Sequence, residues 1–219
     1  DGDNYYYVDV NGVMAANQWV AIDNEDAGDD NEPEHYWYYF QANGKALKQG
    51  DSDTVSLKTV NGKKYAFDEY GAMVAEWSLD KAKASDNVGT SNFAGYEKKA
   101  ESAKYSQSWR YFSSVEDGAR VSKGWFKVVP AEMLNKEKYD DDEESWYYAD
   151  GSGNLYAGEF KTIKGKKYAF RNDGRMLTGL KFIKEGDEDF ADVKADDDDS
   201  RPFDNEDDFF DNAIEFYEP

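Results

Sequence analysis

The sequence contains a long internal repeat, and this repeat limits the possible fold more than any other feature does. Residues 57–77 read LKTVNGKKYAFDEYGAMVAEW and residues 160–180 read FKTIKGKKYAFRNDGRMLTGL, at an offset of 103 residues. Two further motifs precede each copy in the same order: an aromatic pair followed by a glycine and a Trp, and an aromatic triplet WYY with a glycine seven residues after its Trp. Such a duplication indicates an array of small structural units.

Each unit has the pattern of a β-hairpin, with an aromatic strand, a loop that contains glycine, and a second strand. Asn61 and Gly62 give the clearest turn signal, because Asn-Gly supplies the two positive-φ positions of a type I′ turn. In the second copy Lys164 and Gly165 take their place. On this register we expect a strand at 4–9 that belongs to an earlier hairpin, followed by hairpins at 18–40, 55–68, 76–112, 124–149, 159–171 and 179–217.

An isolated hairpin is marginal in water because it cannot bury its apolar face alone, whereas stacked hairpins cover one another. We therefore predict an all-β fold, an elongated solenoid of stacked β-hairpin repeats with acidic insertions at the hairpin tips, and a short helix within residues 96–104. The array divides into a first three-hairpin super-repeat (1–110), a second super-repeat (111–180) and a partial further repeat (181–219). Because the chain begins within a predicted strand, we expect it to be a segment of a longer surface protein.

The charge is concentrated in three segments, 23–34, 130–145 and 185–211. They hold 28 of the 47 acidic residues and four of the 26 basic ones, so the remaining scaffold carries a net +3 although the chain carries −21. Repulsion should keep these insertions solvated and oppose nucleic acid, so we expect no nucleic-acid partner. The acidic runs lack the D-x-D-x-D-G spacing of a calcium loop, and we predict no metal site.

Composition excludes several other classes. The absence of Cys excludes disulfides, thiolate metal sites and a cysteine nucleophile, and His35, the single histidine, is expected at the surface. No apolar run approaches 18 residues, so we expect no membrane insertion. Carboxylates are abundant, but nothing marks two of them as partners across a cleft, so we predict neither an enzyme nor a cofactor.

Three short segments resemble a known family. Residues 124–127 (GWFK), 146–148 (WYY) and 150–153 (DGSG) resemble the cell-wall-binding repeat of Gram-positive surface proteins. That family includes choline-binding modules, glucan-binding modules of streptococcal glucosyltransferases and the repeats of large clostridial toxins, and residues 61–67 with 71–73 are most similar to the clostridial variant. The resemblance implies a β-hairpin solenoid and non-catalytic attachment to a cell-wall polymer or glycan, in an extracellular, secreted or cell-surface protein.

The resemblance also implies a set of ligand-binding aromatics. In the choline-binding branch a cationic head group sits between aromatic rings of successive hairpins, held by cation–π attraction. The same rings are also what core packing alone requires, and they are equally suited to stacking on the apolar faces of sugars. The candidate ligand-binding residues are Trp19, Trp37, Tyr39, Trp77, Trp109, Tyr111, Trp125, Trp146 and Tyr148.

The sequence therefore predicts a cell-wall or glycan binding module that uses aromatics exposed between hairpins. Two alternatives stay open: a choline-type cation binder on teichoic acid, and a structural spacer that presents its acidic loops to a protein partner. The burial of Trp125 and Trp146 separates these readings, because a binding site needs at least one accessible indole whereas a spacer buries both.

Overall fold

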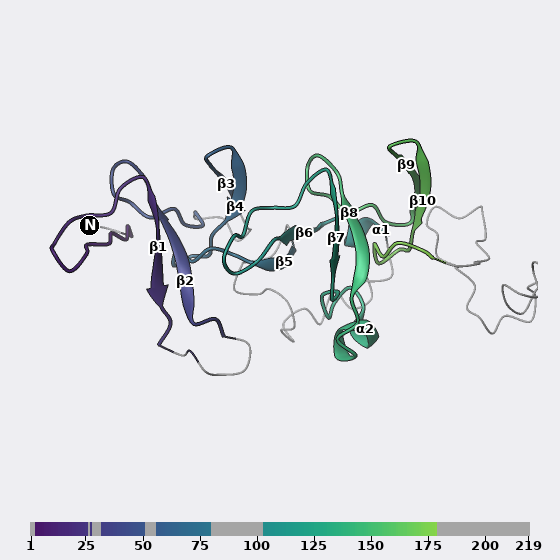
Figure 1. Ribbon diagram of the computed structural model, residues 1–219, viewed down its shortest axis with the longest axis horizontal. Helices are drawn as coiled ribbons and strands as arrows, with labels where there is room; N and C mark the ends of the chain where they lie inside the picture. Colours follow the sequence, from purple (N-terminus) through teal and green to yellow (C-terminus); the bar gives the residue numbers. More distant parts are fainter. Residues whose placement is uncertain (1–2, 26, 28–31, 51–55, 80–102, 179–219) are drawn as a thin grey trace, which may run out of the picture.

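The computed structural model describes residues 3–25, 27, 32–50, 56–79 and 103–178. Within them, ten strands form five two-stranded antiparallel sheets, accompanied by two short helices (Figure 1). The elements are β1 (Gln18–Asp23), β2 (His35–Phe40), β3 (Leu57–Val60), β4 (Lys63–Ala66), β5 (Glu76–Leu79), α1 (Ala103–Ser106), β6 (Trp109–Phe112), β7 (Gly124–Val128), α2 (Lys136–Asp140), β8 (Ser145–Ala149), β9 (Glu159–Ile163) and β10 (Lys166–Phe170).

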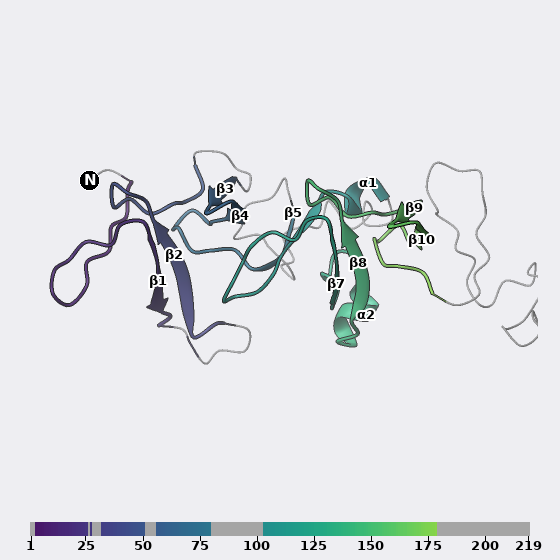
Figure 2. The same cartoon turned by 45° about the horizontal axis from the view of Figure 1, so that its top comes forward.

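The five hairpins follow one another along the longest axis of the molecule in the order of the sequence (Figures 1 and 2). This confirms the all-β hairpin repeat, with the pairings Gln18–Phe40, Glu76–Phe112 and Gly124–Ala149 at the predicted positions. No helix among the described residues has the length and apolar character needed to cross a membrane. The hairpin predicted at 179–217 and the insertion at 185–211 lie outside the described residues.

Two predicted elements near the insertions differ from expectation. Among the described residues, 4–9 form no strand, and Val8 makes only an isolated bridge to Met14. Most of the helix predicted at 96–104 falls outside the described residues, and α1 begins at Ala103. Both helices lie at hairpin tips, where an array accepts added residues without disturbing its strands.

Each hairpin ends in a tight turn that is closed by an isolated β-bridge. After β8, the Asp150 N–H donates to the Asn154 carbonyl at 2.8 Å and Gly153, at φ +80°, donates back to the Asp150 carbonyl. The Asp150 carboxylate accepts the N–H groups of Ser152 and Asn154 at 2.7 and 2.9 Å. Burial acts to raise the pKa of Asp150. A hydrogen bond from the Asn154 side chain, these two backbone hydrogen bonds and the charge of Arg110 outweigh burial and hold the pKa below its ordinary value. The turn therefore needs glycine at Gly153 and a carboxylate at Asp150.

Backbone hydrogen bonds join successive units. The Met73 N–H, after the turn that follows β4, donates to the Trp37 carbonyl of β2 at 2.8 Å. The Met176 N–H, after the turn that follows β10, makes the same bond to the Trp146 carbonyl of β8, also at 2.8 Å. The duplication in sequence is thus a duplication of the contact between neighbouring units, and each contact places a methionine beside a tryptophan.

The largest buried cluster lies around the middle hairpins. It consists of Trp77, Leu79, Tyr105, Trp109, Phe126, Ala131, Leu134, Tyr147, Ala149 and Leu155. Aromatic rings from β5, β6, β7 and β8 supply most of its volume, and helix α1 adds Tyr105. Burial of large aromatic side chains is the main source of stability available to an array of this kind.

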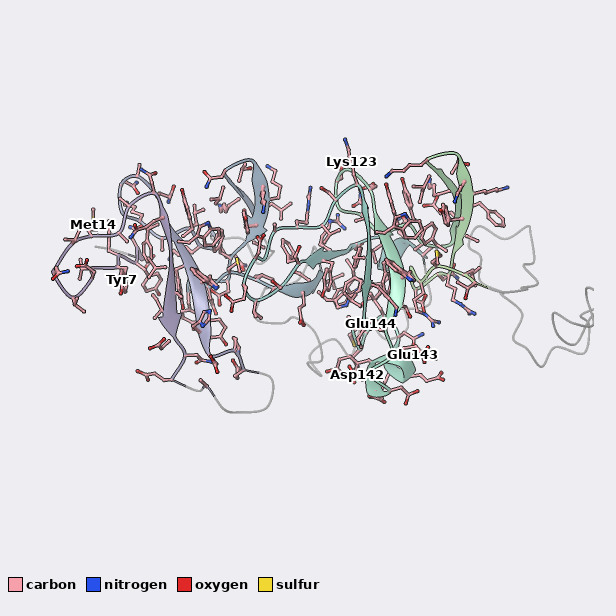
Figure 3. All side chains as sticks on the ribbon, in the orientation of Figure 1. Tyr7, Met14, Lys123, Asp142, Glu143 and Glu144 are labelled. Carbon is pink, nitrogen blue, oxygen red and sulfur yellow. The ribbon has the colours of Figure 1, made fainter. Side chains whose placement is uncertain are left out.

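The insertion at 130–145 differs from the solvated loop predicted for it. Its first residues enter the core, since Ala131 is 0% and Leu134 4% exposed, and Asn135 then caps helix α2 by accepting the Lys138 N–H at 3.0 Å. Its acidic residues from Glu137 to Glu144 are exposed, as predicted, and Figure 3 shows Asp142 and Glu143 at the far end of the hairpin. The apolar residues bury because a two-stranded hairpin cannot cover its own indoles.

Candidate functional site

Two aromatic clusters occupy equivalent positions in the two copies of the repeat. In the first copy, the Trp19 ring lies 5.2 Å from its cross-strand neighbour Tyr39. The same ring lies 4.9 Å from Tyr65 and 5.8 Å from Phe67, both contributed by the next unit. The indole therefore links two hairpins.

The second copy reproduces this geometry around Trp125. Its ring lies 5.1 Å from the cross-strand Tyr148, 4.8 Å from Tyr168 and 5.8 Å from Phe170. The interplanar angle to the stacked Phe is 26° in both copies. All four residues, Trp19, Tyr39, Trp125 and Tyr148, are half-buried, and the two indoles pack against the next unit.

Beside the first cluster is an open groove of about 350 Å³, which we name the Trp37 groove. It is lined by Glu32, Pro33, His35, Tyr36, Trp37, Met73, Ala75, Glu76 and Val115. The half-buried Trp37 donates its indole N–H to Glu116 at 3.0 Å, and the other oxygen of that carboxylate lies 3.0 Å from His35 Nε2. The His35 ring meets Trp37 edge-on at 5.6 Å. This groove combines an aromatic wall with carboxylates.

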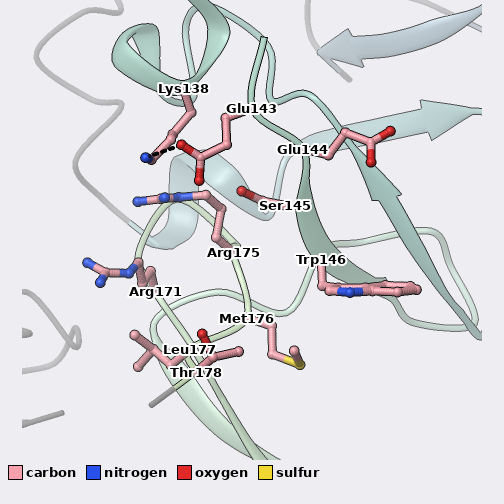
Figure 4. Close-up of a pocket in the computed structure, with 10 residues that line it drawn as sticks. All are labelled: Lys138, Glu143, Glu144, Ser145, Trp146, Arg171, Arg175, Met176, Leu177 and Thr178. Atoms are coloured by element: carbon pink, nitrogen blue, oxygen red, sulfur yellow. Dashed lines mark hydrogen bonds and ion pairs between the residues drawn. The ribbon is translucent and has the colours of Figure 1, made fainter. Parts of the chain in front are cut away.

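An equivalent groove of about 330 Å³ lies beside the second cluster, and we name it the Trp146 groove (Figure 4). It is lined by Lys138, Glu143, Glu144, Ser145, Trp146, Arg171, Arg175, Met176, Leu177 and Thr178. Trp146 is 42% exposed, and its ring meets that of Trp125 edge-on at 6.4 Å. Of the two indoles singled out in the sequence, one is thus half-buried and the other faces solvent at a groove shared with the next unit.

The middle hairpin carries the same aromatic motif in a different environment. Trp77 and Trp109 are 2% and 0% exposed, with ring centroids 6.2 Å apart. Trp77 donates its indole N–H to the Val129 carbonyl at 2.8 Å and meets the half-buried Tyr111 at 5.0 Å. Burial, with added repulsion from Glu76, raises the pKa of Tyr111 to about 12. A ligand reaches these two indoles only if the core opens, and their binding role stays a prediction.

Sequence reasoning missed several groove residues. Met73 and Met176 each line a groove beside a tryptophan of the preceding unit. Arg171 and Arg175 were not singled out, although the copies align them with Asp68 and Ala72. Comparing the charges of the two copies position by position would have identified these two arginines.

Comparison with known proteins adds one informative similarity. No family model matches the chain. Glucosyltransferase-S of Streptococcus mutans serotype c is 26% identical over 179 residues, which cover 82% of this chain and 8% of that protein. The chain resembles the cell-wall-binding, choline-binding and glucan-binding repeat family. The chain therefore spans only a small part of the length of this relative.

Several solved structures of Streptococcus pneumoniae proteins resemble the chain. Choline binding protein F is 22% identical with a TM-score of 0.45, and the match covers 83% of this chain and 58% of that one. CbpJ is 18% identical with a TM-score of 0.46, covering 83% and 59%. The modular autolysin LytC, in complex with a synthetic peptidoglycan ligand, is 18% identical with a TM-score of 0.44, covering 78% and 27%.

Proposed function

We propose that this chain is a non-catalytic module that binds a cell-wall polymer or glycan on a secreted or surface-attached Gram-positive protein. Its hairpins form a solenoid, and the ligand lies across the Trp37 and Trp146 grooves. The observation that carries the proposal is the duplication of the groove itself. In both copies a tryptophan of one unit lies beside a methionine of the next, at the same backbone hydrogen bond.

The chemistry of the grooves supports weak, repeated binding. Both are open and shallow, and each offers an aromatic face with a few polar groups that orient a ligand. Two such sites on one rigid array raise the overall affinity for a polymer without any new contact, because the second site binds intramolecularly. Similarity to Glucosyltransferase-S supports a polysaccharide as the ligand.

The Trp37 groove favours a second candidate, a choline-type cation. Glu32 and Glu76 line this groove and Glu116 bonds the Trp37 indole, so carboxylates surround an aromatic wall. Cations are attracted to the faces of indole and phenol rings, and neighbouring carboxylates add to this attraction. A quaternary ammonium group on a wall polymer fits such a groove.

The decisive experiment measures retention of the chain on purified Gram-positive cell walls and on dextran beads, with and without competing choline. We expect Trp37→Ala and Trp146→Ala each to reduce retention, because each should weaken the free energy of binding by about 1–2 kcal/mol, the value of a lost stacking or cation–π contact. Tyr70→Ala is the matched control, because Tyr70 is 62% exposed and lies outside both grooves. It should keep the wild-type retention.

The outcomes separate the alternatives. Elution of the wild-type chain by choline, abolished in Trp37→Ala, supports the cation candidate at that groove. Retention on dextran that resists choline supports glycan stacking. The proposal is contradicted if the wild-type chain is retained on neither material. It is also contradicted if both Trp variants are retained as well as the Tyr70→Ala control. Either result leaves the structural spacer.

A further inference from the structure

The two grooves are built by equivalent segments, but basic residues line only one of them in the part of the chain that the structure describes. Among the described residues, the side chains that line the Trp37 groove include Glu32 and Glu76 and neither Lys nor Arg. The lining of the Trp146 groove includes three basic residues, Lys138, Arg171 and Arg175, together with the acidic Glu143 and Glu144. Both arginines belong to the turn after β10, where the first copy has Asp68 and Ala72, so the frame is conserved between the copies and its charge is not.

The basic groups gather on one side of the Trp146 groove. Figure 4 shows the head groups of Lys138, Arg171 and Arg175 near one another, with the Trp146 ring on the opposite side and Met176 between them. The three cations come from helix α2 and from the following unit, so the contact between the two units creates the arrangement.

The acidic groups around this groove already have basic partners. Glu143 pairs with Lys138. Glu144 pairs at 3.2 Å with Lys127, which does not line the groove. Asp173 accepts the Arg175 Nε–H at 2.7 Å. This last bond holds the Arg175 side chain, which is only 16% exposed, and it uses one of the five N–H donors of a guanidinium.

We infer that the Trp146 groove binds an anionic group, a carboxylate or a phosphodiester, carried by the polymer that the module attaches to. This inference rests on the proposed function and specifies the chemistry of one of its two grooves. Arg171 and Arg175 bind the anion, because a planar guanidinium matches two oxygens at once, and Trp146 covers the apolar part of the adjoining unit of the polymer.

The negative charge of the whole chain does not oppose this local recognition. Salt screens charges beyond about 8 Å at physiological ionic strength, so an acidic residue farther away than this contributes little inside the groove. The Trp37 groove, with Glu32 and Glu76, disfavours the same anion. The two grooves therefore select different groups along a polymer, and they are not interchangeable.

The test compares two anionic probes, poly(glycerol phosphate) and polygalacturonate, by titration calorimetry on the full chain. We expect the double variant Arg171→Gln/Arg175→Gln to bind both at least about tenfold more weakly, the effect of losing charge-assisted hydrogen bonds. The matched control is Lys164→Gln/Lys166→Gln, which removes two exposed charges from the tip of the β9–β10 hairpin. It should keep the wild-type affinity.

Because Arg175→Gln leaves Asp173 without this partner, Arg171→Gln alone provides a second variant, and circular dichroism checks the fold of each. A preference for poly(glycerol phosphate) assigns the groove to phosphodiesters, and a preference for polygalacturonate assigns it to carboxylates. Wild-type binding of both anions by the double variant, or an equal loss in the lysine control, overturns the inference. If the inference is overturned but the wild-type chain is retained on cell walls or dextran, the proposed function still holds. If the wild-type chain binds none of the polymers, both the inference and the proposed function are overturned.

Discussion

The β5–β6 and β7–β8 hairpins carry the same aromatic motif and use it in opposite ways. In the first, Trp77 and Trp109 lie in the core with 2% and 0% of their surface exposed. In the second, Trp146 is 42% exposed and Trp125 half-buried. The motif therefore determines the position of each indole on its strand, but it does not determine the exposed fraction of that indole.

The difference comes from the residues that cover each hairpin. Ala131 and Leu134, in the insertion of the β7–β8 hairpin, pack in the same cluster as Trp77 and Trp109. Tyr105 in helix α1 closes that cluster, with its ring 6.3 Å from Trp109. The comparison shows that insertions at hairpin tips convert a potential binding face into core.

The largest effect that tests this comparison is on stability. Trp109→Ala removes a fully buried indole and should lower the free energy of unfolding by about 3–5 kcal/mol. Trp146→Ala removes an exposed ring and should lower it by less than about 1 kcal/mol. Urea unfolding followed by circular dichroism measures both. Equal losses in the two variants would show that the hairpins do not differ in the way described.

A second effect separates the two faces of strand β8. Tyr147 points into the core, 5.0 Å from the Trp77 ring, while its neighbour Trp146 lines the groove. Burial raises the pKa of Tyr147 above its ordinary value of 10, and the charge of Asp173 adds to the shift. Among the described atoms, its hydroxyl has no hydrogen-bond partner. The folded state therefore opposes ionisation of this phenol.

Because the pKa is higher in the folded state, this contribution to stability is intact below pH 10 and is lost as the pH rises above that value. Tyr147→Phe removes the group, so the free energy of unfolding of the variant relative to the wild type should rise by about 1.4 kcal/mol between pH 9 and pH 11. The exposed Tyr139→Phe is the control and should show a smaller change. Parallel pH profiles for the wild type and Tyr147→Phe would contradict burial of this hydroxyl.

Local pattern was sufficient to predict the frame of the molecule. Asn61 and Gly62 occupy positive-φ positions in the β3–β4 turn, as their residue types indicate, and the strand partners of Gln18, Glu76 and Gly124 follow from the repeat. These features depend on residues close in sequence or on the two copies being equivalent, so a single sequence contains enough information to fix them.

The accessibility of the site was not predictable in the same way. Leu134 belongs to an acidic segment, 130–145, for which charge repulsion predicted a solvated loop. It is nevertheless 4% exposed, because it covers indoles of a hairpin that is distant in sequence. The cations of the Trp146 groove likewise come together only through the contact between α2 and the turn after β10. Such contacts are tertiary, and strand periodicity contains no information about them.

The smallest expected effect concerns Asn135, which fastens the insertion that covers the core. Its Oδ1 caps helix α2 at the Lys138 N–H, and its Nδ2 donates to Asp173 of the following unit at 2.9 Å. Asn135→Ala should lower the free energy of unfolding by about 1 kcal/mol, the usual value of a lost cap, and Asn135→Ser should recover part of it by keeping a capping oxygen.

The same variant tests whether this cap keeps the core covered. Trp77 donates its indole N–H to Val129, directly before the insertion, so a loosened insertion should speed hydrogen exchange at that indole about fivefold. NMR exchange of the Trp77 N–H, with the Trp125 N–H as reference, measures this directly. An unchanged exchange rate in Asn135→Ala would mean that the apolar contacts of Ala131 and Leu134 hold the insertion without the cap, and that burial of the β5–β6 indoles does not depend on the link to the next unit.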